Sequence, residues 1–174
     1  MKPYLVLVIF AIATLHGLEV GHSEEFSENE IVELLAPAGA FSRDPRGIKV
    51  KPAQNEKKPS INMRVQFEYN SDVLTTEALI SLKTLGNALN HPKLDGFVFQ
   101  IVGHTDAKGS DNYNMDLSKR RANAVREHLS FYYDVDAERL AAIGMGESNL
   151  YDASNPEAAI NRRVEIKNTL KRRD

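Results

Sequence analysis

The sequence predicts an α/β domain, a two-layer sandwich in which helices pack on one sheet in the order β-α-β-α-β. Short segments with alternating or continuous apolar residues are typical of strands. These segments alternate along the chain with two longer ones, in which apolar residues recur every three or four positions as in a helix. This pattern covers residues 62–170 of a chain of 174 residues, 42% of them hydrophobic. That length suits one modest domain with its own core, preceded by further segments.

The first residues are typical of an export signal. An apolar run over residues 3–15 follows Lys2. Its length matches the hydrophobic region of a signal peptide rather than the ~20 apolar residues that a membrane-spanning helix needs. Small residues precede Glu24, so we interpret residues 1–23 as a signal peptide that is cleaved before this glutamate. An uncleaved N-terminal anchor is the alternative interpretation.

Residues 24–61 form a predicted N-terminal extension with one short helix. Ser27 and Glu30 have the spacing of a capping box at the start of this helix, and Pro37 ends it. One side of the helix would be lined by Ile31, Leu34 and Leu35. A helix this short frays in water unless it docks on the domain. The polar residues 42–60 contain three prolines and predict a linker or strap.

The predicted domain opens with a strand and a helix. Residues 63–69 (MRVQFEY) alternate, which favours a strand with Val65, Phe67 and Tyr69 on one side. A helix begins with Thr75 or Thr76 as its N-cap and stops before Pro92. Its apolar stripe consists of Leu79, Leu82, Leu85, Ala88 and Leu89.

A second strand and a second helix follow. Residues 96–104 (GFVFQIVGH) are nearly continuously apolar, which is typical of an interior strand buried on both faces. The second helix runs from Asp111 or Asp116 to Tyr132. The stripe that faces the sheet consists of Ala122, Val125, Leu129 and Tyr132.

The last two strands are predicted at residues 139–146 (RLAAIGMG) and 161–170 (NRRVEIKNTL). In the latter, Val164 and Ile166 alternate with polar residues. The glycine-rich GMGES is interpreted as a turn, because no lysine or helix start follows it as a phosphate loop requires. Residues 171–174 (KRRD) form a polar tail.

The composition excludes several kinds of chemistry and partner. The net charge of −2 gives no global attraction to nucleic acid, and the basic tail lacks interleaved aromatic residues. The chain has no cysteine, which excludes disulfides, thiol catalysis, thiolate metal sites and a lipidated cysteine.

Charges gather between the second strand and the second helix. Arg121 lies four residues after Leu117 and four before Val125, at the edge of the apolar face, where an unpaired charge is costly. Asn114 lies two turns earlier, and Asp106 follows the buried strand. Asp106, Asn114 and Arg121 could therefore converge on one site. An ion pair between Asp106 and Arg121 with a purely structural role is an equal alternative.

Three motifs follow one another along the chain: GHTDAKGSDNYNMDLSKRRANAVREHL, RLAAIGMGES and NRRVEI. With FEYNSDVLT before them, they cover roughly residues 62–167. In this order they are similar to the OmpA-like C-terminal domain, the peptidoglycan-associated module of Gram-negative envelopes. One segment departs from the family: NPEAAI stands before NRRVEI where many members have a glycine-arginine pair.

The resemblance implies a binding site for the diaminopimelate of the cell-wall stem peptide. Asp106 would bind its ammonium and Arg121 its carboxylate, with support from Thr105, Asn114 and Arg162. The chemistry fits, because the planar guanidinium meets a carboxylate with two parallel hydrogen bonds that a lysine cannot reproduce. Arg163 would point to the other face of its strand and have a structural partner.

The function implied is non-catalytic: peptidoglycan binding that anchors or organises the envelope, without cofactor or metal. An exported protein of this kind would lie in the periplasm, where peripheral association with the outer membrane and contacts with other envelope proteins are compatible with it. No nucleic acid is expected as a partner.

Two rival interpretations remain. His104 and Asp106 form an H-x-D pair that could hold a metal, with Asp111 and Asp116 nearby. However, those two aspartates are typical helix-start acids, and no second histidine has ligand spacing. No G-x-S-x-G elbow supports a serine nucleophile. The other rival is an envelope adaptor that recruits a protein through residues 24–61, which would then order only with that partner.

Overall fold

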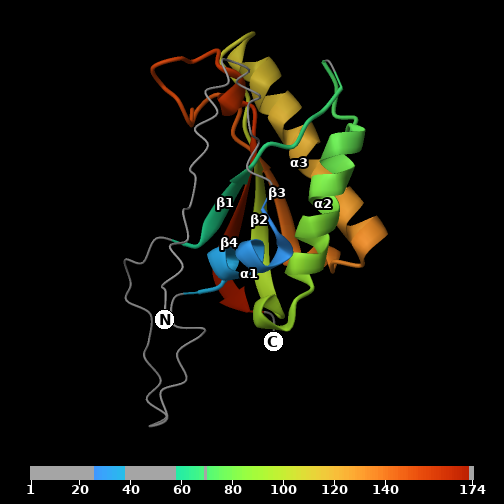
Figure 1. Ribbon diagram of the computed structural model, residues 1–174. Helices are drawn as coiled ribbons and strands as arrows, with labels where there is room; N and C mark the ends of the chain where they lie inside the picture. Colours follow the sequence, from blue (N-terminus) through green and yellow to red (C-terminus); the bar gives the residue numbers. More distant parts are fainter. Residues whose placement is uncertain (1–25, 38–57, 69, 173–174) are drawn as a thin grey trace, which may run out of the picture.

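Helices gather on one face of a mixed sheet in this domain. The computed structural model describes residues 26–37, 58–68 and 70–172. The helices of this part of the chain are α1 (Glu28–Leu35), α2 (Thr76–Leu89) and α3 (Asp111–Tyr133). Its strands are β1 (Ser60–Met63), β2 (Phe97–Gly103), β3 (Leu140–Gly144) and β4 (Val164–Arg172). Figure 1 shows their arrangement.

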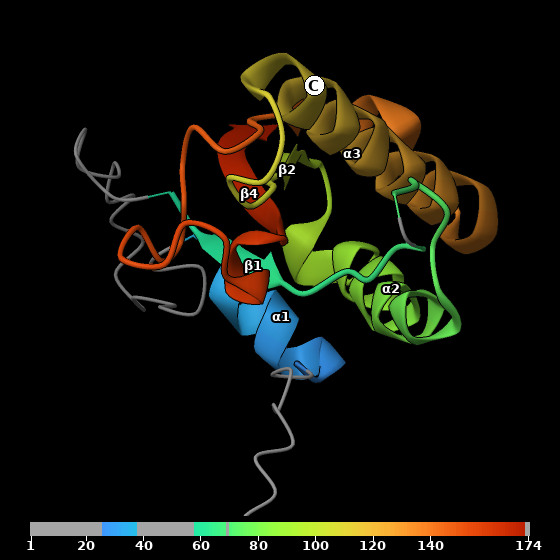
Figure 2. The ribbon, with the colours of Figure 1, turned by 90° about the horizontal axis from the view of Figure 1, so that it is seen from above.

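The strand order is β1-β4-β2-β3, with the two longest strands at the centre. β4 is antiparallel to both β1 and β2, whereas β2 and β3 are parallel and joined by α3 as a crossover helix. Seen from above, α2 and α3 lie side by side on one side of the sheet, and α1 lies beside β1 (Figure 2). The predicted α/β class is confirmed, with β4 returning between β1 and β2.

One core joins the sheet to all three helices. Ile166 of β4 lies between Ile61 of β1 and Ile101 of β2 in register, and all three side chains are buried. This row packs against buried residues of α1, α2 and α3 in a single cluster. The prediction that β2 is buried on both faces holds only in part, because Val98 and Gln100 on the opposite face are half-buried.

The first strand lies earlier than predicted. β1 ends at Met63, and the alternating residues after it form a local hairpin instead. Phe67 forms an isolated bridge with Leu74, and two backbone hydrogen bonds flank it, from Glu68 to Val73 and from Thr75 to Gln66. The alternation at residues 65–67 therefore serves this hairpin and not the sheet. Tyr69 lies outside the described residues, as do the predicted signal peptide and residues 42–57 of the predicted strap.

The short helix α1 docks on the domain. The capping box is present: the Ser27 backbone N–H donates to Glu30 Oε2 at 2.8 Å, and the Glu30 N–H donates to Ser27 Oγ at 3.4 Å. Asn168 of β4, fully buried, donates from Nδ2 to the Leu35 carbonyl at 2.9 Å. The buried face consists of Ile31, Val32 and Leu35. Leu34 is 46% exposed, so its predicted place on that face is wrong.

The helix α2 begins as predicted and differs in one core position. Thr75 is the N-cap, and its hydroxyl accepts from the Ala78 N–H at 3.3 Å. Leu79 is 38% exposed because it lies on the outer side of the first turn, whereas Leu82, Leu85 and Leu89 are fully buried.

Two glycines bring α3 close to the sheet. Gly103 of β2 and Gly144 of β3 are partners in register. A Cβ atom at Gly103 would lie 2.2 Å from the Ser118 carbonyl oxygen, and one at Gly144 would lie 2.6 Å from the Lys119 nitrogen. This contact places the first turns of α3 beside the ends of β2 and β3. At the other end of α3, Tyr132 is 64% exposed, contrary to the prediction.

Tyr132 is exposed because α2 approaches α3 on the side of the neighbouring tyrosine. A Cβ atom at Gly86 of α2 would lie 2.6 Å from Cγ of Tyr133.

In the part of the chain that the structure describes, no helix is long and apolar enough to cross a membrane. The strand β4 continues to Arg172, two residues into the segment predicted as a polar tail.

Candidate functional site

The candidate site lies where β2 ends and α3 begins. Backbone hydrogen bonds tie the loop after β2 to its surroundings: His104 donates to Arg163 at 2.9 Å, Thr105 to Gly146 at 2.9 Å and Ala107 to Pro156 at 3.0 Å. The loop is therefore held by β4 and by the long connection between β3 and β4. In Figure 1 this region is the upper end of the sheet.

Asp106 is paired with Arg162. The Nη1 atom of Arg162 donates to Oδ2 of Asp106 at 2.6 Å, and the Lys108 backbone N–H donates to Oδ1 at 3.3 Å. The carboxylate side chain is 9% exposed, whereas that of Arg162 is 44% exposed. A charge-assisted hydrogen bond of this length is among the strong ones. Asp106 is therefore already neutralised by an arginine that remains open to solvent.

Arg121 is held beside this pair by other contacts. Its Nε donates to the Ser71 carbonyl at 3.0 Å, and its guanidinium carbon lies 4.8 Å from the centre of the Phe67 ring. Its two Nη groups have no hydrogen-bond partner among the described residues, and these residues include no ion pair between Asp106 and Arg121. The structural pair with Asp106 is thus made by Arg162, and the Arg121 fork remains available.

The electrostatic environment of Arg121 explains why that fork favours an anion. Burial lowers the pKa of Arg121, the Arg162 guanidinium lowers it further, and Tyr113 and Asp106 oppose this decrease. The Arg162 guanidinium therefore repels that of Arg121, while the Asp106 and Asp72 carboxylates attract it. A second negative charge at this place would relieve the repulsion.

The neighbouring Arg120 holds the segment that contacts Arg121. Its Nη1 pairs with the Asp116 carboxylate one turn earlier, and its Nε lies 4.0 Å from Oδ2 of Asp72. Because Ser71 accepts from Arg121, the two consecutive arginines attach the same short segment to α3. Arg120 is thus a structural residue and Arg121 the one with free donors.

Asn114 fixes the conformation of the loop after β2. Its side chain is buried, and Nδ2 donates to the Asp106 carbonyl at 3.2 Å, to the Lys108 carbonyl at 3.0 Å and to the Glu147 carboxylate. The predicted support by Asn114 therefore acts on the backbone around Asp106. Thr105 is also buried, and its hydroxyl has no hydrogen-bond partner among the described residues.

Asn161, for which the sequence predicts no role, organises the connection before β4. Asn161 is fully buried, and Nδ2 donates to the carbonyls of Asp152, Asn155 and Pro156. Pro156 in turn accepts from the backbone of Ala107. The divergent NPEAAI segment therefore does contact the Asp106 loop, through main-chain atoms. A buried asparagine has no periodic signal, so only the structure could reveal this role.

His104 was considered as a metal ligand, and it lies in a different environment. Its ring Nε2 is 3.4 Å from Oε2 of Glu165, and its Nδ1 has no partner among the described residues. Burial, followed by the charge of Arg163, lowers the pKa of His104 to about 4, although Glu165 opposes this. Within the described ranges, no three histidine, aspartate or glutamate side chains gather as a metal site.

Arg163 has the structural contacts predicted for it. It donates to Asn62 Oδ1 at 3.0 Å and to the Asn149 carbonyl at 3.2 Å, and it lies 5.5 Å from the centre of the Tyr151 ring. Both arginines of NRRVEI lie just before β4, which begins at Val164 rather than at Asn161 as predicted. Arg162 contacts Asp106, whereas Arg163 contacts Asn62 and Asn149.

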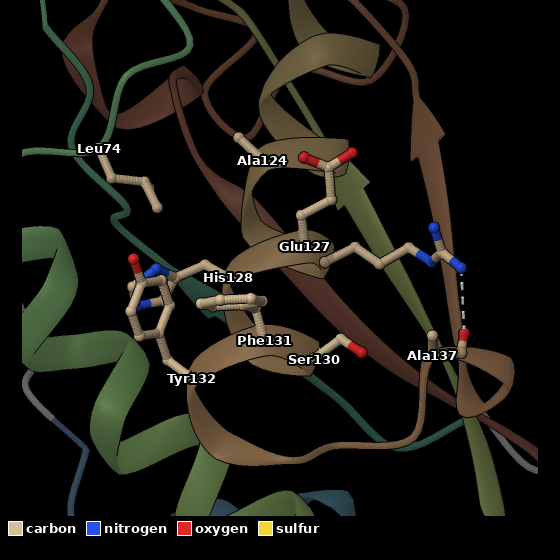
Figure 3. Close-up of a pocket in the computed structure, with 9 residues that line it drawn as sticks. Leu74, Ala124, Glu127, His128, Ser130, Phe131, Tyr132 and Ala137 are labelled. Carbon is tan, nitrogen blue, oxygen red and sulfur yellow. Dashed lines mark hydrogen bonds between the residues drawn. The ribbon is translucent and has the colours of Figure 1, made fainter.

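A shallow depression lies elsewhere, over the C-terminal half of α3 (Figure 3). Phe131 and His128 line it together with Leu74 from the segment before α2. Phe131 is 78% exposed. None of the five predicted site residues lines this depression, so it is separate from the charged site.

The comparisons agree with this architecture. Residues 66–163, more than half of the chain, match the OmpA family. Outer membrane porin F of Pseudomonas aeruginosa is 38% identical over 108 residues, which are 60% of this chain and 30% of that protein. Outer membrane protein A of Salmonella typhi is 34% identical over 162 residues, which are 86% of this chain and 43% of that protein. The chain thus spans less than half of these relatives.

A solved structure supports the same assignment. The cell wall anchor of the T6SS from Pseudomonas aeruginosa is 28% identical with a TM-score of 0.51, covering 63% of this chain and 79% of that chain. The resemblance inferred from the three motifs is confirmed, because the family match contains the Asp106 loop, α3 and the start of NRRVEI. The chain therefore belongs to the OmpA family.

Proposed function

We propose that this protein binds peptidoglycan, without catalysis, through the zwitterionic end of diaminopimelate in the stem peptide. Asp106 receives the ammonium and Arg121 the carboxylate that share one carbon of that residue. Thr105 and Asn114 support the loop, and Arg162 takes part from the segment before β4. The binding anchors or organises the cell envelope.

The observation that carries the proposal is the state of Arg121. Its two Nη groups have no acceptor among the described residues, although the side chain is half-buried beside Phe67. These donors are therefore open to an acceptor that a ligand brings. The buried Thr105 hydroxyl also lacks a partner in the described part of the chain. A ligand carboxylate supplies the acceptor that the planar fork is shaped to bind.

The affinity expected from these contacts is modest. Each charge-assisted hydrogen bond contributes roughly 1.5–3 kcal/mol when shielded from water. Two or three such bonds sum to roughly 3–9 kcal/mol, and the middle of that range corresponds to a dissociation constant from the micromolar to the sub-millimolar range for a single stem peptide. A polymer with many such peptides adds avidity, because released molecules rebind neighbouring stems.

The relatives favour an envelope location for this activity. Two of them are named as outer-membrane proteins, and one neighbouring structure is described as a cell wall anchor. We place this protein in the periplasm after export, with peripheral association to the outer membrane. No nucleic acid is involved in the proposed function.

The alternative of an envelope adaptor acting through residues 24–61 has less support. It requires that the extension order only with a partner. The helix α1 instead packs on the domain in the chain alone, where Asn168 binds its last turn. Residues 38–57 of the extension lie outside the described residues.

A pull-down on purified sacculi tests the proposal. Residues 24–174 should sediment with diaminopimelate-type sacculi, and Asp106→Ala and Arg121→Ala should both lose this binding while remaining folded. Lys119→Ala is the matched control, since it removes a positive charge from the exposed side of α3 two residues before Arg121. Failure of the folded wild type to sediment would refute wall binding.

A further inference from the structure

The pair between Asp106 and Arg162 raises a question about how a ligand enters. Both oxygens of the carboxylate are engaged, Oδ2 by Arg162 Nη1 at 2.6 Å and Oδ1 by the Lys108 N–H at 3.3 Å. An incoming ammonium therefore has to compete with the Arg162 guanidinium for Oδ2 of this largely buried carboxylate. Replacement leaves the Arg162 guanidinium without its partner, and this loss opposes binding unless the ligand compensates for it.

We propose that Arg162 is the specificity-determining residue of the site, because it releases Asp106 only to an ammonium that arrives with a carboxylate on the same carbon. Arg162 then binds that carboxylate together with Arg121. This inference rests on the proposed function and adds to it a rule for which wall peptides are accepted. The ligand class is an amino-acid zwitterion, and a lone amine is rejected.

The charges of the site support an exchange of this kind. In the free protein, Asp106 faces two guanidinium groups, those of Arg162 and Arg121. A zwitterion brings no net charge and gives every one of these groups an opposite partner. A lone ammonium takes the carboxylate and leaves both guanidinium groups unpaired near one another. Like charges in a half-buried site repel more strongly than in water, so the second outcome is disfavoured.

The local structure lets Arg162 move while its backbone stays in place. Its side chain is 44% exposed, whereas the Asp106 side chain is 9% exposed. The preceding residue, Asn161, is fully buried and held by three carbonyl groups, and the next residue, Arg163, has its own partners on the other face. The exchange therefore needs a rotation of one solvent-exposed side chain and no change in the fold.

The wall chemistry that follows from this rule is simple. A stem peptide with diaminopimelate at its third position ends that side chain in an ammonium and a carboxylate on one carbon. A peptide with lysine there ends in an ammonium alone. The two differ by the one group for which Arg162 is proposed to act, so they form a matched pair of probes.

The experiment compares these two synthetic tripeptides by calorimetry with residues 24–174 as wild type, Arg162→Gln and the control Lys119→Gln. The wild type and the control should prefer the diaminopimelate peptide. In Arg162→Gln, the ratio of the two dissociation constants should fall by about tenfold, the effect of one charge-assisted contact. The lysine peptide should bind Arg162→Gln more tightly than it binds the wild type.

Other outcomes overturn the inference in distinguishable ways. If Arg162→Gln weakens both peptides equally, Arg162 only supports the site. If both dissociation constants of Arg162→Gln equal those of the wild type, Arg162 has no part in recognition. If the wild type binds neither peptide, the proposed function itself fails.

A measurement on the wild type keeps the test independent of any folding defect in the variant. In an NMR titration of the wild type, the Arg162 Nε–H resonance should have shifted once the diaminopimelate peptide saturates the site, because the Arg162 guanidinium then contacts the ligand carboxylate instead of Asp106. An unchanged Arg162 resonance with bound diaminopimelate peptide would show that the pair with Asp106 persists, and would refute the exchange.

Discussion

Of the two arginines near Asp106, Arg121 is the one at which we expect lysine to be a poor substitute. Arg121 is half-buried with both Nη groups free among the described residues, so its planar fork is the part that matters. Arg121→Lys keeps the charge and loses the second parallel hydrogen bond. We expect binding of the diaminopimelate peptide to weaken about tenfold, with the melting temperature within a few degrees of wild type. Calorimetry checks the affinity, and equal affinity would contradict a bidentate contact.

His104 makes stability depend on pH. Its pKa in the folded protein is about 4, below the ordinary value of 6.5, because the ring is buried and Arg163 lies nearby. Glu165, opposite the ring, favours the charged form, and Lys167 opposes it. The unfolded chain therefore takes up a proton first as the pH falls. The stabilisation from a neutral His104 is complete above pH 6.5 and is lost as the pH falls toward 4.

Urea unfolding at pH 7.5 and pH 4.5 measures this effect. The free energy of unfolding should fall by at most about 3 kcal/mol from this residue between the two conditions. In His104→Gln the decrease should be smaller, because glutamine does not titrate. An identical decrease in both proteins would show that other groups cause it.

Spacing in the sequence predicted that Asp106, Asn114 and Arg121 lie near one another, and it did not predict which residue pairs with Asp106. Spacing along α3 was enough to bring Asn114 and Arg121 to one side, and Asp106 follows a recognisably buried strand. The partner of Asp106 is Arg162, which is 56 residues away. That contact depends on how the connection before β4 is folded around Asn161, and no pattern in the sequence encodes this path.

At the scale of elements, the position of α3 depends on two glycines. A Cβ atom at Gly103 would lie 2.2 Å from the Ser118 carbonyl oxygen, a backbone atom that cannot rotate away. Gly103→Ala should therefore push α3 from the sheet and lower the free energy of unfolding by about 1–3 kcal/mol. Chemical denaturation measures this. Unchanged stability would show that α3 shifts without cost.

The docking of α1 is tested by two adjacent leucines. Leu35 is fully buried, and Leu34 is 46% exposed. Leu35→Ala should cost about 2–5 kcal/mol of stability, since it opens a cavity in the core. Leu34→Ala should cost about 0.5 kcal/mol or less. If thermal unfolding gave similar small losses for both variants, α1 would not be part of the core in solution.

Local signals predicted the starts of helices better than the edges of the sheet. The capping box at Ser27 and the N-cap at Thr75 are both present, because their geometry is decided within a few residues. The first strand was misplaced, because the alternation around Phe67 is satisfied by a local bridge to Leu74. Alternation indicates an extended chain, and it does not indicate which chain is the neighbour.

For the whole molecule, α1 and the sheet share one core. All three helices and the strands contribute to a single core, and β1 begins at Ser60. A fragment of residues 62–170, the domain predicted from the sequence, lacks α1, half of β1 and the end of β4. We expect a clearly lower unfolding midpoint for this fragment than for residues 24–174. Equal midpoints would show that the extension is energetically separate.

An NMR titration of residues 24–174 with the diaminopimelate tripeptide tests whether the end of β2 binds a zwitterion. We predict saturable shifts at Thr105, Asp106 and the Arg121 side chain, with a dissociation constant in the micromolar to sub-millimolar range and no such shifts in Asp106→Ala. Shifts confined to the depression around Phe131, or no shifts in the folded protein, would contradict a zwitterion site at the end of β2.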